Sequence, residues 1–218
     1  MHILITAGPT REPLDPVRYL TNRSSGKMGY ALAEEARDAG HKVTLISGPV
    51  FLPAPTDITL VKVETAREMF EAVQKHIASA DVAIFAAAVA DYRPVVKAMQ
   101  KIKKSADSLT LELERTEDIL GSARNVFGFK GCLVGFAAET EKLIEHAQDK
   151  LVRKGCDLII ANDVSQPGIG FDSAENAITL CVPGGQTQSL PQQSKTALAH
   201  ELIQFITRLA ASSKTPHV

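Results

Sequence analysis

The chain has 218 residues, of which 44% are hydrophobic and 22% are charged, and its formal net charge is −1. These proportions are ordinary for globular proteins and argue against disorder, while the balanced charge gives no reason to expect a nucleic acid or a membrane surface as partner. No apolar run approaches the ~20 residues of a membrane span. The N-terminal MHILITAG is too short and uncharged for a signal peptide, so we expect a cytoplasmic protein.

Short apolar runs alternate with helical patterns along the first half of the chain. Residues 3–6 form an apolar run stopped by Gly8-Pro9, which is typical of a strand buried on both faces. Residues 28–39 have helical spacing and end at Gly40, a residue suited to a helix C-terminus. Further strands are predicted at 43–46, 58–63 and 82–88, with a helix at 66–78.

The same alternation continues in the second half. Strands are predicted at 132–137 and 158–161 around a helix at 139–154, and a final helix at 195–211. Residues 109–113 and 177–182 instead alternate apolar and polar side chains, which predicts half-exposed antiparallel strands. Gly184-Gly185 would turn the second of these toward a partner near 187–190.

This pattern predicts an α/β fold: a Rossmann-like, mostly parallel sheet with helices on both faces and a small antiparallel β appendage. No repeat or linker divides the sequence, so we expect one domain over residues 1–212 and a frayed tail over 213–218.

The three cysteines, Cys132, Cys156 and Cys181, are widely spaced and lie in or beside apolar runs. Without a CxxC pair, a disulfide framework or a structural zinc site is disfavoured, and we expect small core residues. The six histidines have no metal-ligand spacing, and the metal ligands are left unassigned.

Polar segments follow four of the predicted strands. They cover residues 8–29, 87–104, 136–139 and 162–172, and they are rich in Gly, Asn, Asp, Ser or Lys. In an open parallel sheet, ligands bind beyond the carboxyl ends of the strands. The four segments together therefore predict a polar ligand at that edge.

The first segment leads through Ser25-Gly26 into a helix. Free backbone N–H groups and the positive end of the helix dipole would suit a phosphate there, although Ser25 could equally serve as a plain helix cap. A Walker A loop would need Gly at position 21 and Ser or Thr at position 28, where the chain has Thr21 and Met28. A dinucleotide fingerprint would follow the strand directly, so a dehydrogenase is a poor fit.

Small residues and lysines mark the second segment. Ala86 and Ala87 would let a planar or sugar group approach the backbone, and Asp91 could hold a ribose hydroxyl or a metal ion. The run 101–104 has three lysines that suit an anionic ligand, though such runs are usually solvated loops.

Lys150 and Lys154 share a face of a predicted helix because they are four residues apart. They could reach a polyphosphate. They could also pair with Asp149 or Glu145 on the helix surface and contribute little.

The polar segments and their surroundings contain a series of short motifs: GPTRE at 8–12, DPVR at 15–18, NRSSGKMG at 22–29, AAVADY at 87–92, KIKK at 101–104, GFAAET at 135–140, ANDVS at 161–165, and GFD at 170–172 with Asn176. Taken together, these motifs resemble bacterial phosphopantothenoylcysteine synthetase, the phosphopantothenate–cysteine ligase of coenzyme A biosynthesis. They follow one another in order over nearly the whole chain.

The resemblance implies a two-step reaction. The carboxylate of 4′-phosphopantothenate is activated by the co-substrate CTP, with Mg²⁺, as an acyl-cytidylate, and the amine of cysteine then displaces CMP. In many bacteria the ligase is fused to a flavin-dependent decarboxylase, so such a partner domain is expected. The family is typically dimeric, so a homodimer is expected as well. The resemblance, rather than any base-reading residue, favours CTP over the ATP of eukaryotic relatives.

The resemblance also implies site residues. Asn22 and Lys101 are expected to be catalytic, Asn22 chiefly in converting the acyl-cytidylate. Nucleotide-binding residues are expected at Ser25, Gly26, Phe85, Ala86, Ala87, Asp91, Lys101, Glu117, Asp118, Ile119, Leu120, Phe136, Lys150 and Lys154. The chain departs from the family at Glu117-Asp118, where many relatives have Pro-Asp or Pro-Glu, so the geometry of that loop is open.

Two other classes of function compete with the ligase. One is a Rossmann-type dehydrogenase or flavoprotein, but the compact Gly-rich turn that such a protein needs is missing from this sequence. The other is a nucleotide-binding domain without catalysis, which would not need both Asn22 and Lys101. The absence of a Gly-x-Ser-x-Gly elbow disfavours a serine hydrolase.

Overall fold

The computed structural model describes residues 1–104, 107–139, 141–163, 173 and 175–212. Its main feature is an eight-stranded sheet in the order β12-β11-β10-β9-β6-β1-β4-β5. The strands are β1 (His2–Ala7), β4 (Lys42–Ser47), β5 (Thr59–Lys62), β6 (Val82–Phe85), β9 (Cys132–Glu139), β10 (Leu158–Asp163), β11 (Glu175–Cys181) and β12 (Thr187–Ser194). The first six are mutually parallel, and β11 and β12 are antiparallel additions at one end.

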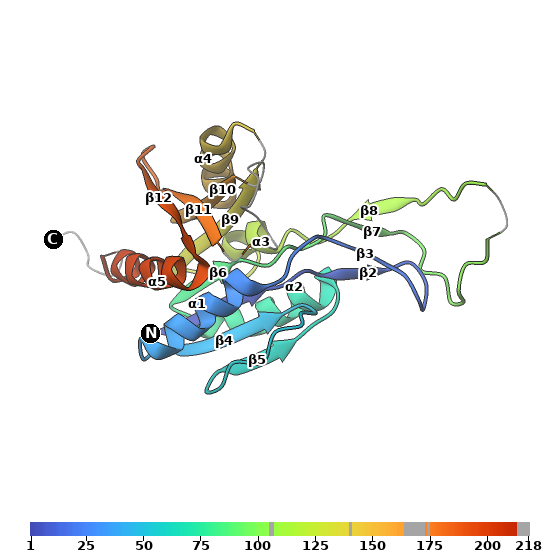
Figure 1. Cartoon of the computed structure of the whole chain (residues 1–218), viewed down its shortest axis with the longest axis horizontal. Coiled ribbons are helices and arrows are strands. Elements are labelled where there is room, and N and C mark those ends of the chain that lie inside the picture. Colours follow the sequence, from blue (N-terminus) through green and yellow to red (C-terminus); the bar gives the residue numbers. More distant parts are fainter. Residues whose placement is uncertain (105–106, 140, 164–172, 174, 213–218) are drawn as a thin grey trace.

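Helices cover both faces of the sheet (Figure 1). One face carries α1 (Lys27–Asp38) and α5 (Lys195–Ser212), and the other carries α2 (Ala66–His76), α3 (Ile119–Asn125) and α4 (Leu143–Lys154), with a short 3₁₀ turn, η1 (Ile77–Ser79), after α2. Local sequence explains the helix ends. Thr65 caps α2 by accepting a hydrogen bond from the N–H of Glu68, and Gly155 ends α4 with a positive φ of 62°.

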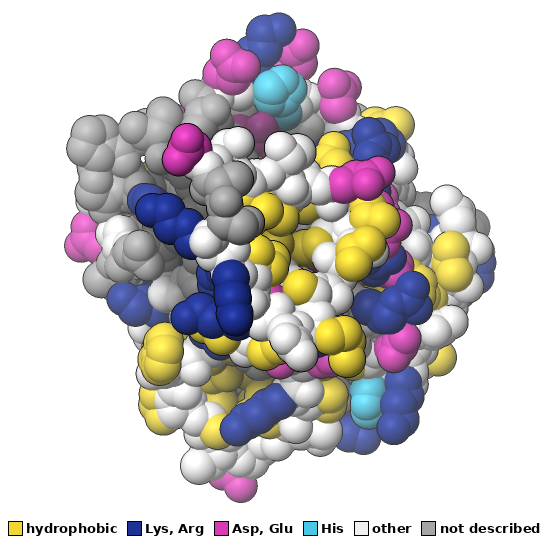
Figure 2. All heavy atoms as spheres, turned by 90° about the vertical axis from the view of Figure 1, so that its right-hand side faces the viewer, with side chains coloured by type: hydrophobic (Ala, Val, Ile, Leu, Met, Phe, Trp, Pro, Cys, Tyr) yellow, Lys and Arg dark blue, Asp and Glu magenta, His cyan; other side chains and the backbone are white. Residues whose placement is uncertain are grey.

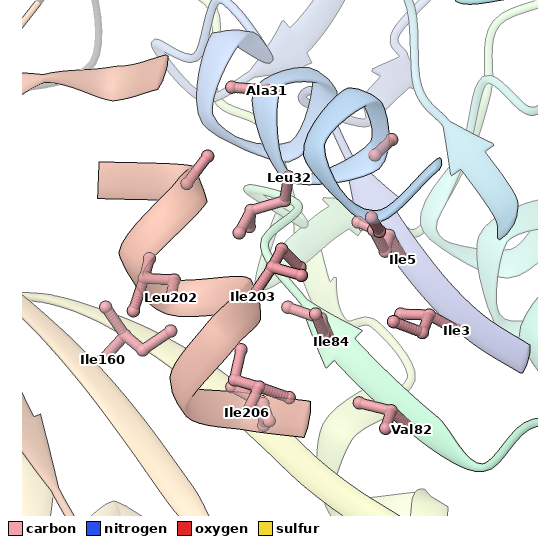
Figure 3. Packing of buried hydrophobic residues seen from close by; sticks show 14 of the residues in the cluster. Ile3, Ile5, Ala31, Leu32, Val82, Ile84, Ile160, Leu202, Ile203 and Ile206 are labelled. Atoms are coloured by element: carbon pink, nitrogen blue, oxygen red, sulfur yellow. The ribbon is translucent and has the colours of Figure 1, made fainter. Parts of the chain in front are cut away.

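The hydrophobic core lies between the sheet and these helices. Figure 3 shows Ile3, Ile84 and Ile160 of the sheet facing Leu202, Ile203 and Ile206 of α5. Nearly all these side chains are completely buried. Burial of one such side chain stabilises the fold by about 1.5–3 kcal/mol, so this layer accounts for much of the fold's cohesion.

We call the eight-stranded sheet with its helices the body. Two small antiparallel sheets project from it as an extended arm (Figure 1). One pairs β2 (Arg11–Pro13) with β3 (Tyr19–Thr21), and the other pairs β7 (Tyr92–Pro94) with β8 (Leu113–Arg115). We call residues 11–21, 92–104 and 107–115 the arm. Its apolar side chains are largely exposed, up to 87% for Met99.

The expected α/β fold with a mostly parallel sheet, two helical faces and an antiparallel appendage is confirmed. Two details are corrected. Residues 178–181 are fully buried rather than half-exposed, because β11 lies between β10 and β12. The strand expected at 109–113 begins only at Leu113, and the appendage is built from it together with β2, β3 and β7.

The other predicted elements lie close to their expected positions, with α4 beginning at Leu143 because 139 still belongs to β9. All three cysteines are buried and free, as expected. Residues 213–218, the expected tail, lie outside the described residues, as do 164–172 of the fourth polar segment. Among the described helices, none is both long and apolar enough to cross a membrane.

Candidate functional site

The carboxyl ends of β1 and β6 mark the point where the chain reverses its direction across the sheet. From β1 the chain continues to β4 and β5 on one side, whereas from β6 it continues to β9 and β10 on the other. Ligands bind at such switch points in open α/β sheets. A cleft with a volume of about 970 Å³ lies here, bordered by the segments that follow β1 and β6 and by the carboxyl ends of β9 and β10.

The start of α1 forms one wall of the cleft. Gly26 is the cap residue at φ 76°, and an added Cβ there would lie 2.6 Å from the Val50 side chain. A Cβ on Gly29 would lie 2.5 Å from that of Ala7, so α1 starts close against β1. Ser25 is not the cap, which excludes the plain capping alternative, while the open helix start keeps the geometry of a phosphate site.

The segment after β6 is fixed by the segment after β1. Ala88 forms a parallel bridge with Pro9 and donates its N–H to the carbonyl of Gly8 at 2.9 Å. The N–H of Ala90 donates to Thr10 Oγ1, also at 2.9 Å. The backbone beside the cleft is therefore an ordered continuation of the sheet, and the predicted residues Phe85, Ala86, Ala87 and Asp91 all border the cleft.

Asn22 spans these two segments at the cleft wall. Its Nδ2 donates to the carbonyls of Val89 at 2.9 Å and Ala88 at 3.3 Å. Both amide protons are therefore engaged, and Oδ1 is the atom of Asn22 suited to a ligand, as an acceptor.

The opposite wall is the start of α3 with the residues before it. Asp118 caps α3 by accepting from the N–H of Gly121 at 2.9 Å, and it also accepts a hydrogen bond from Lys154 of α4. Burial would raise the pKa of Asp118, but Lys154 and the Gly121 N–H outweigh it and hold this pKa below its ordinary value. The predicted stretch 117–120 lines the cleft here.

Lys150 is held beneath this region by the carbonyl of Phe136, to which its Nζ donates at 2.7 Å. Burial lowers the pKa of Lys150, with Glu139 partly opposing the shift. Among the described residues, the surface ion pairs with Asp149 or Glu145 are not formed, since Glu145 pairs with Lys142. Both predicted lysines, with Phe136, line the cleft.

Lys101 is the one predicted site residue that does not line this cleft in the described structure. It is exposed on the arm, beside a clasp formed by Asp15 and Arg18. Asp15 Oδ2 accepts the N–H of Ile102 at 3.1 Å, and Arg18 Nη2 donates to the Ile102 carbonyl at 2.7 Å. The clasp thus fixes the peptide next to Lys101, whose catalytic role remains a prediction.

Sequence reasoning missed several polar residues in the cleft wall, among them Asn162 at the end of β10, Asn176 on β11 and Lys195 at the start of α5. All three are more than nine-tenths buried. In the described structure, Oδ1 of both asparagines has no hydrogen-bond partner. Asn162 and Asn176 lay inside quoted motifs, and a polar residue at a buried strand end was the signal that could have singled them out.

The cleft carries cationic groups beside apolar surface. Viewed from the arm side, Lys and Arg side chains lie on both sides of a central hydrophobic area (Figure 2). Among the residues that are described, no three His, Cys, Asp or Glu side chains form a metal-binding group. The site therefore suits a polyphosphate with a planar base, and the described part of the chain offers no carboxylate cage for a metal ion.

Comparisons with known proteins give the family to which the sequence is similar. The family model described as the DNA/pantothenate metabolism flavoprotein C-terminal domain matches residues 1–209. The coenzyme A biosynthesis bifunctional protein CoaBC of Vibrio vulnificus is 50% identical over 209 residues, which cover 95% of this chain and 52% of that protein. The chain thus spans about half the length of the curated relatives it matches.

Solved structures show the same likeness. The crystal structure of the C-terminal domain of CoaBC superimposes with a TM-score of 0.81 at 43% identity, covering 97% of this chain and 96% of that one. The DNA/pantothenate metabolism flavoprotein from Streptococcus pneumoniae gives a TM-score of 0.83 at 26% identity, covering 95% and 99%.

Proposed function

The chain belongs to the family of DNA/pantothenate metabolism flavoprotein C-terminal domains, and from this premise we propose that it is a phosphopantothenate–cysteine ligase of coenzyme A biosynthesis. Its substrates are 4′-phosphopantothenate, cysteine and CTP, and its products are phosphopantothenoylcysteine, CMP and pyrophosphate. One observation carries the proposal: the nucleotide residues expected from the family motifs, apart from Lys101, border a single cleft at the switch point of the sheet.

In the first step, a carboxylate oxygen of phosphopantothenate attacks the α-phosphorus of CTP. An O–P bond forms, and the bond to the β-phosphate breaks as pyrophosphate leaves. Negative charge accumulates on the phosphates in this step. We assign the offsetting of that charge to three groups at the cleft. The start of α1 brings the positive end of the helix dipole, and Lys150 and Lys154 bring ammonium groups.

In the second step, the amine of cysteine attacks the acyl carbon, a C–N bond forms and CMP leaves with the electrons of the C–O bond. The amine loses a proton to solvent. Asn22 Oδ1 is suited to accept a hydrogen bond from the incoming amine, because Nδ2 is already committed to the carbonyls of Ala88 and Val89. The role of Asn22 is therefore mainly to orient the amine.

CTP and Mg²⁺ are proposed as co-substrate and counter-ion on the basis of the family motifs. Since the described residues offer no cluster of carboxylates, Mg²⁺ is expected to be held mainly by the triphosphate oxygens. Asp91 is assigned to the ribose region and Phe136 to the surface beside the nucleotide, in keeping with their positions on the cleft.

Two partners complete the proposal. A flavin-dependent decarboxylase domain is expected beside this one, because the curated relatives are bifunctional proteins about twice as long. A cytoplasmic homodimer is also proposed, and the exposed apolar side chains of the arm, such as Val96 at 77%, favour a second copy as their cover.

The experiment mixes the protein with CTP, 4′-phosphopantothenate, cysteine and Mg²⁺ and measures pyrophosphate and the cysteine amide. Pyrophosphate released only when both CTP and phosphopantothenate are present supports the ligase. ATP in place of CTP tests the base preference. Nucleotide binding without pyrophosphate would instead indicate a binding domain without catalysis, and hydride transfer would indicate a dehydrogenase.

A variant separates the two steps. Asn22→Asp would place a carboxylate against the Ala88 and Val89 carbonyls and beside an anionic intermediate. We expect acyl-cytidylate and pyrophosphate still to form, while amide formation falls roughly 10²-fold, because the variant loses the Nδ2 hydrogen bonds that hold its oxygen in place. Mass spectrometry of quenched reactions checks this. Normal product without trapped intermediate would remove Asn22 from the catalytic residues.

A further inference from the structure

We infer that Glu117 is a positioning residue for nucleotide binding: clamped by Arg93 and Arg67, it fixes the turn before α3 that borders the cleft. The inference rests on the proposed function and deepens it, because it assigns a task to one of the residues that border the cleft. Neither arginine lines the cleft in the described structure. Their influence on the ligand therefore runs through Glu117.

The carboxylate of Glu117 is bound from two sides. Arg93 of β7 donates its Nη1 to both carboxylate oxygens, at 3.0 and 2.9 Å. Arg67 of α2 brings its Nη2 to within 3.1 Å of Oε1. Glu117 thus joins the arm and α2 to the chain segment that leads into α3.

The burial of the three side chains indicates which contact matters more. The Glu117 and Arg93 side chains are only 20% and 23% exposed, whereas Arg67 is 62% exposed. Exposed ion pairs contribute little, but a half-buried pair with two oxygens engaged holds both geometry and charge. Burial would raise the pKa of Glu117, but Arg93 outweighs it and keeps this pKa below its ordinary value.

The residues on either side of Glu117 are fixed independently. Thr116 Oγ1 donates to the carbonyl of Ala90 at 2.6 Å, and the Thr116 N–H donates to the carbonyl of Asp91 at 3.0 Å. Asp118 caps α3 and accepts from Lys154. Glu117 is therefore the link between two anchored residues, and its backbone torsions set how 118–120 face the nucleotide.

A proline at position 117 would restrain the same backbone torsion without any ion pair. Proline fixes φ through its ring and gives up the backbone N–H. Thr116 directly follows β8, and the residue before a proline favours extended backbone. The clamp would thus restrain by ion pairing what a proline ring restrains covalently.

Three variants test this inference in the full chain. Glu117→Ala removes the clamp, Glu117→Pro removes it but restrains φ, and Glu114→Ala is the matched control. Glu114 accepts from Nε of the same Arg93 at 2.8 Å but does not line the cleft. Thermal unfolding first establishes that all three fold like the wild type.

Calorimetric titration with CTP gives the first readout. We expect Glu117→Ala to weaken CTP binding roughly threefold to tenfold. Glu117→Pro should restore most of the affinity lost in the alanine variant, and Glu114→Ala should match the wild type. In turnover, the loss should appear in the KM for CTP while kcat and the KM for cysteine change little. A purely structural residue would not be rescued by proline.

Hydrogen exchange without ligand gives the second readout, which does not depend on the proposed reaction. The amides of 119–122 should exchange faster in Glu117→Ala and recover in Glu117→Pro. Unchanged exchange and unchanged CTP affinity in the alanine variant would overturn the inference, as would failure of proline to restore either. If the wild type binds no CTP, the proposed function fails, and the exchange data alone decide on the clamp.

Discussion

The body and the arm are held together by different forces. In the body, buried strands and helices present completely buried aliphatic side chains to one another, as Ile84 and Leu202 do. In the arm, apolar side chains face solvent and the chain is fixed by polar contacts, above all those of Asp15. A protein can thus stabilise its scaffold and place a functional segment by separate means.

The difference has a consequence for mutations. Aliphatic burial is non-directional and distributed over many contacts, so a change in the body should alter global stability. The contacts of the arm are few and directional, so a change there should alter geometry near Lys101 and leave the body folded.

Ile84→Ala should cause the largest loss in the free energy of unfolding. Ile84 is completely buried in β6, and removing its side-chain carbons leaves a cavity between the sheet and α5. We expect a loss of about 2–5 kcal/mol in the free energy of unfolding, measured by urea denaturation. A loss below about 1 kcal/mol would contradict the assignment of cohesion to this layer.

Asp15→Asn should damage activity more than stability. The amide of the variant lacks the negative charge that binds the Arg18 guanidinium. Its NH₂ group would also face the Ile102 N–H, another donor, so the peptide beside Lys101 would be released. If Lys101 serves catalysis, pyrophosphate release should fall roughly tenfold or more, as in Lys101→Gln, with a smaller loss of stability than in Ile84→Ala. Asp107→Asn, also on the arm, is the control. Equal rates in wild type and Asp15→Asn would separate the clasp from Lys101.

Acid should open the clasp of the arm only at unusually low pH. Burial would raise the pKa of Asp15, but Arg18 and the N–H groups of Val17 and Ile102 hold this pKa far below its ordinary value of about 4. A lowered pKa gives a contribution that is complete above the unfolded-state pKa and is lost as pH falls through the folded one. We therefore expect amide protection at Ile102 to persist at pH 4. Loss of protection near pH 5 would contradict this prediction.

The cysteines report on the body alone, since all three lie there. Burial raises the pKa of Cys132 and of Cys156 to about 12 in each case, and burial also raises that of Cys181. Thiolates react and thiols do not, so at pH 8 a disulfide reagent should modify none of them in the native protein and all of them in urea. Rapid native labelling would show that the body opens locally.

Val96→Ser should have the smallest effect on stability. Its side chain is 77% exposed on the arm, and such positions usually change the free energy of unfolding by less than about 0.5 kcal/mol. If the arm is covered by a second copy, the variant should dissociate at higher protein concentration than the wild type. Sedimentation measures this, and a large loss of monomer stability would place Val96 in a core after all.

The body was largely readable from the sequence because its strands are apolar runs and its helices are periodic. The arm was not, since β2, β3 and β7 have three residues each and carry no periodic pattern. Their positions depend on contacts between distant residues, such as that of Asp15 with Ile102, which no local pattern encodes. The burial of β11 was missed for a similar reason: it depends on the strand that pairs beyond it.

The candidate site also has residues that the sequence predicted and residues that it did not. Most of the expected nucleotide residues border the cleft, whereas Asn162 and Asn176 were missed although they lie inside family motifs. Arg67, Arg93 and Lys195 lie outside those motifs, and only the fold brings Arg67 and Arg93 to Glu117 or Lys195 to the cleft.

The bridge between Pro9 and Ala88 has a consequence for how the cleft takes up a ligand. Because the segments after β1 and β6 are hydrogen-bonded to each other beyond the ends of their strands, their torsions are settled when the chain folds. Ordering a backbone residue costs about 1–2 kcal/mol in conformational entropy, and at this wall that loss precedes ligand arrival. Binding here should therefore resemble contact with a rigid surface. Solvent viscosity should affect the association rate only through diffusion, and the backbone order parameters of these segments should hardly change.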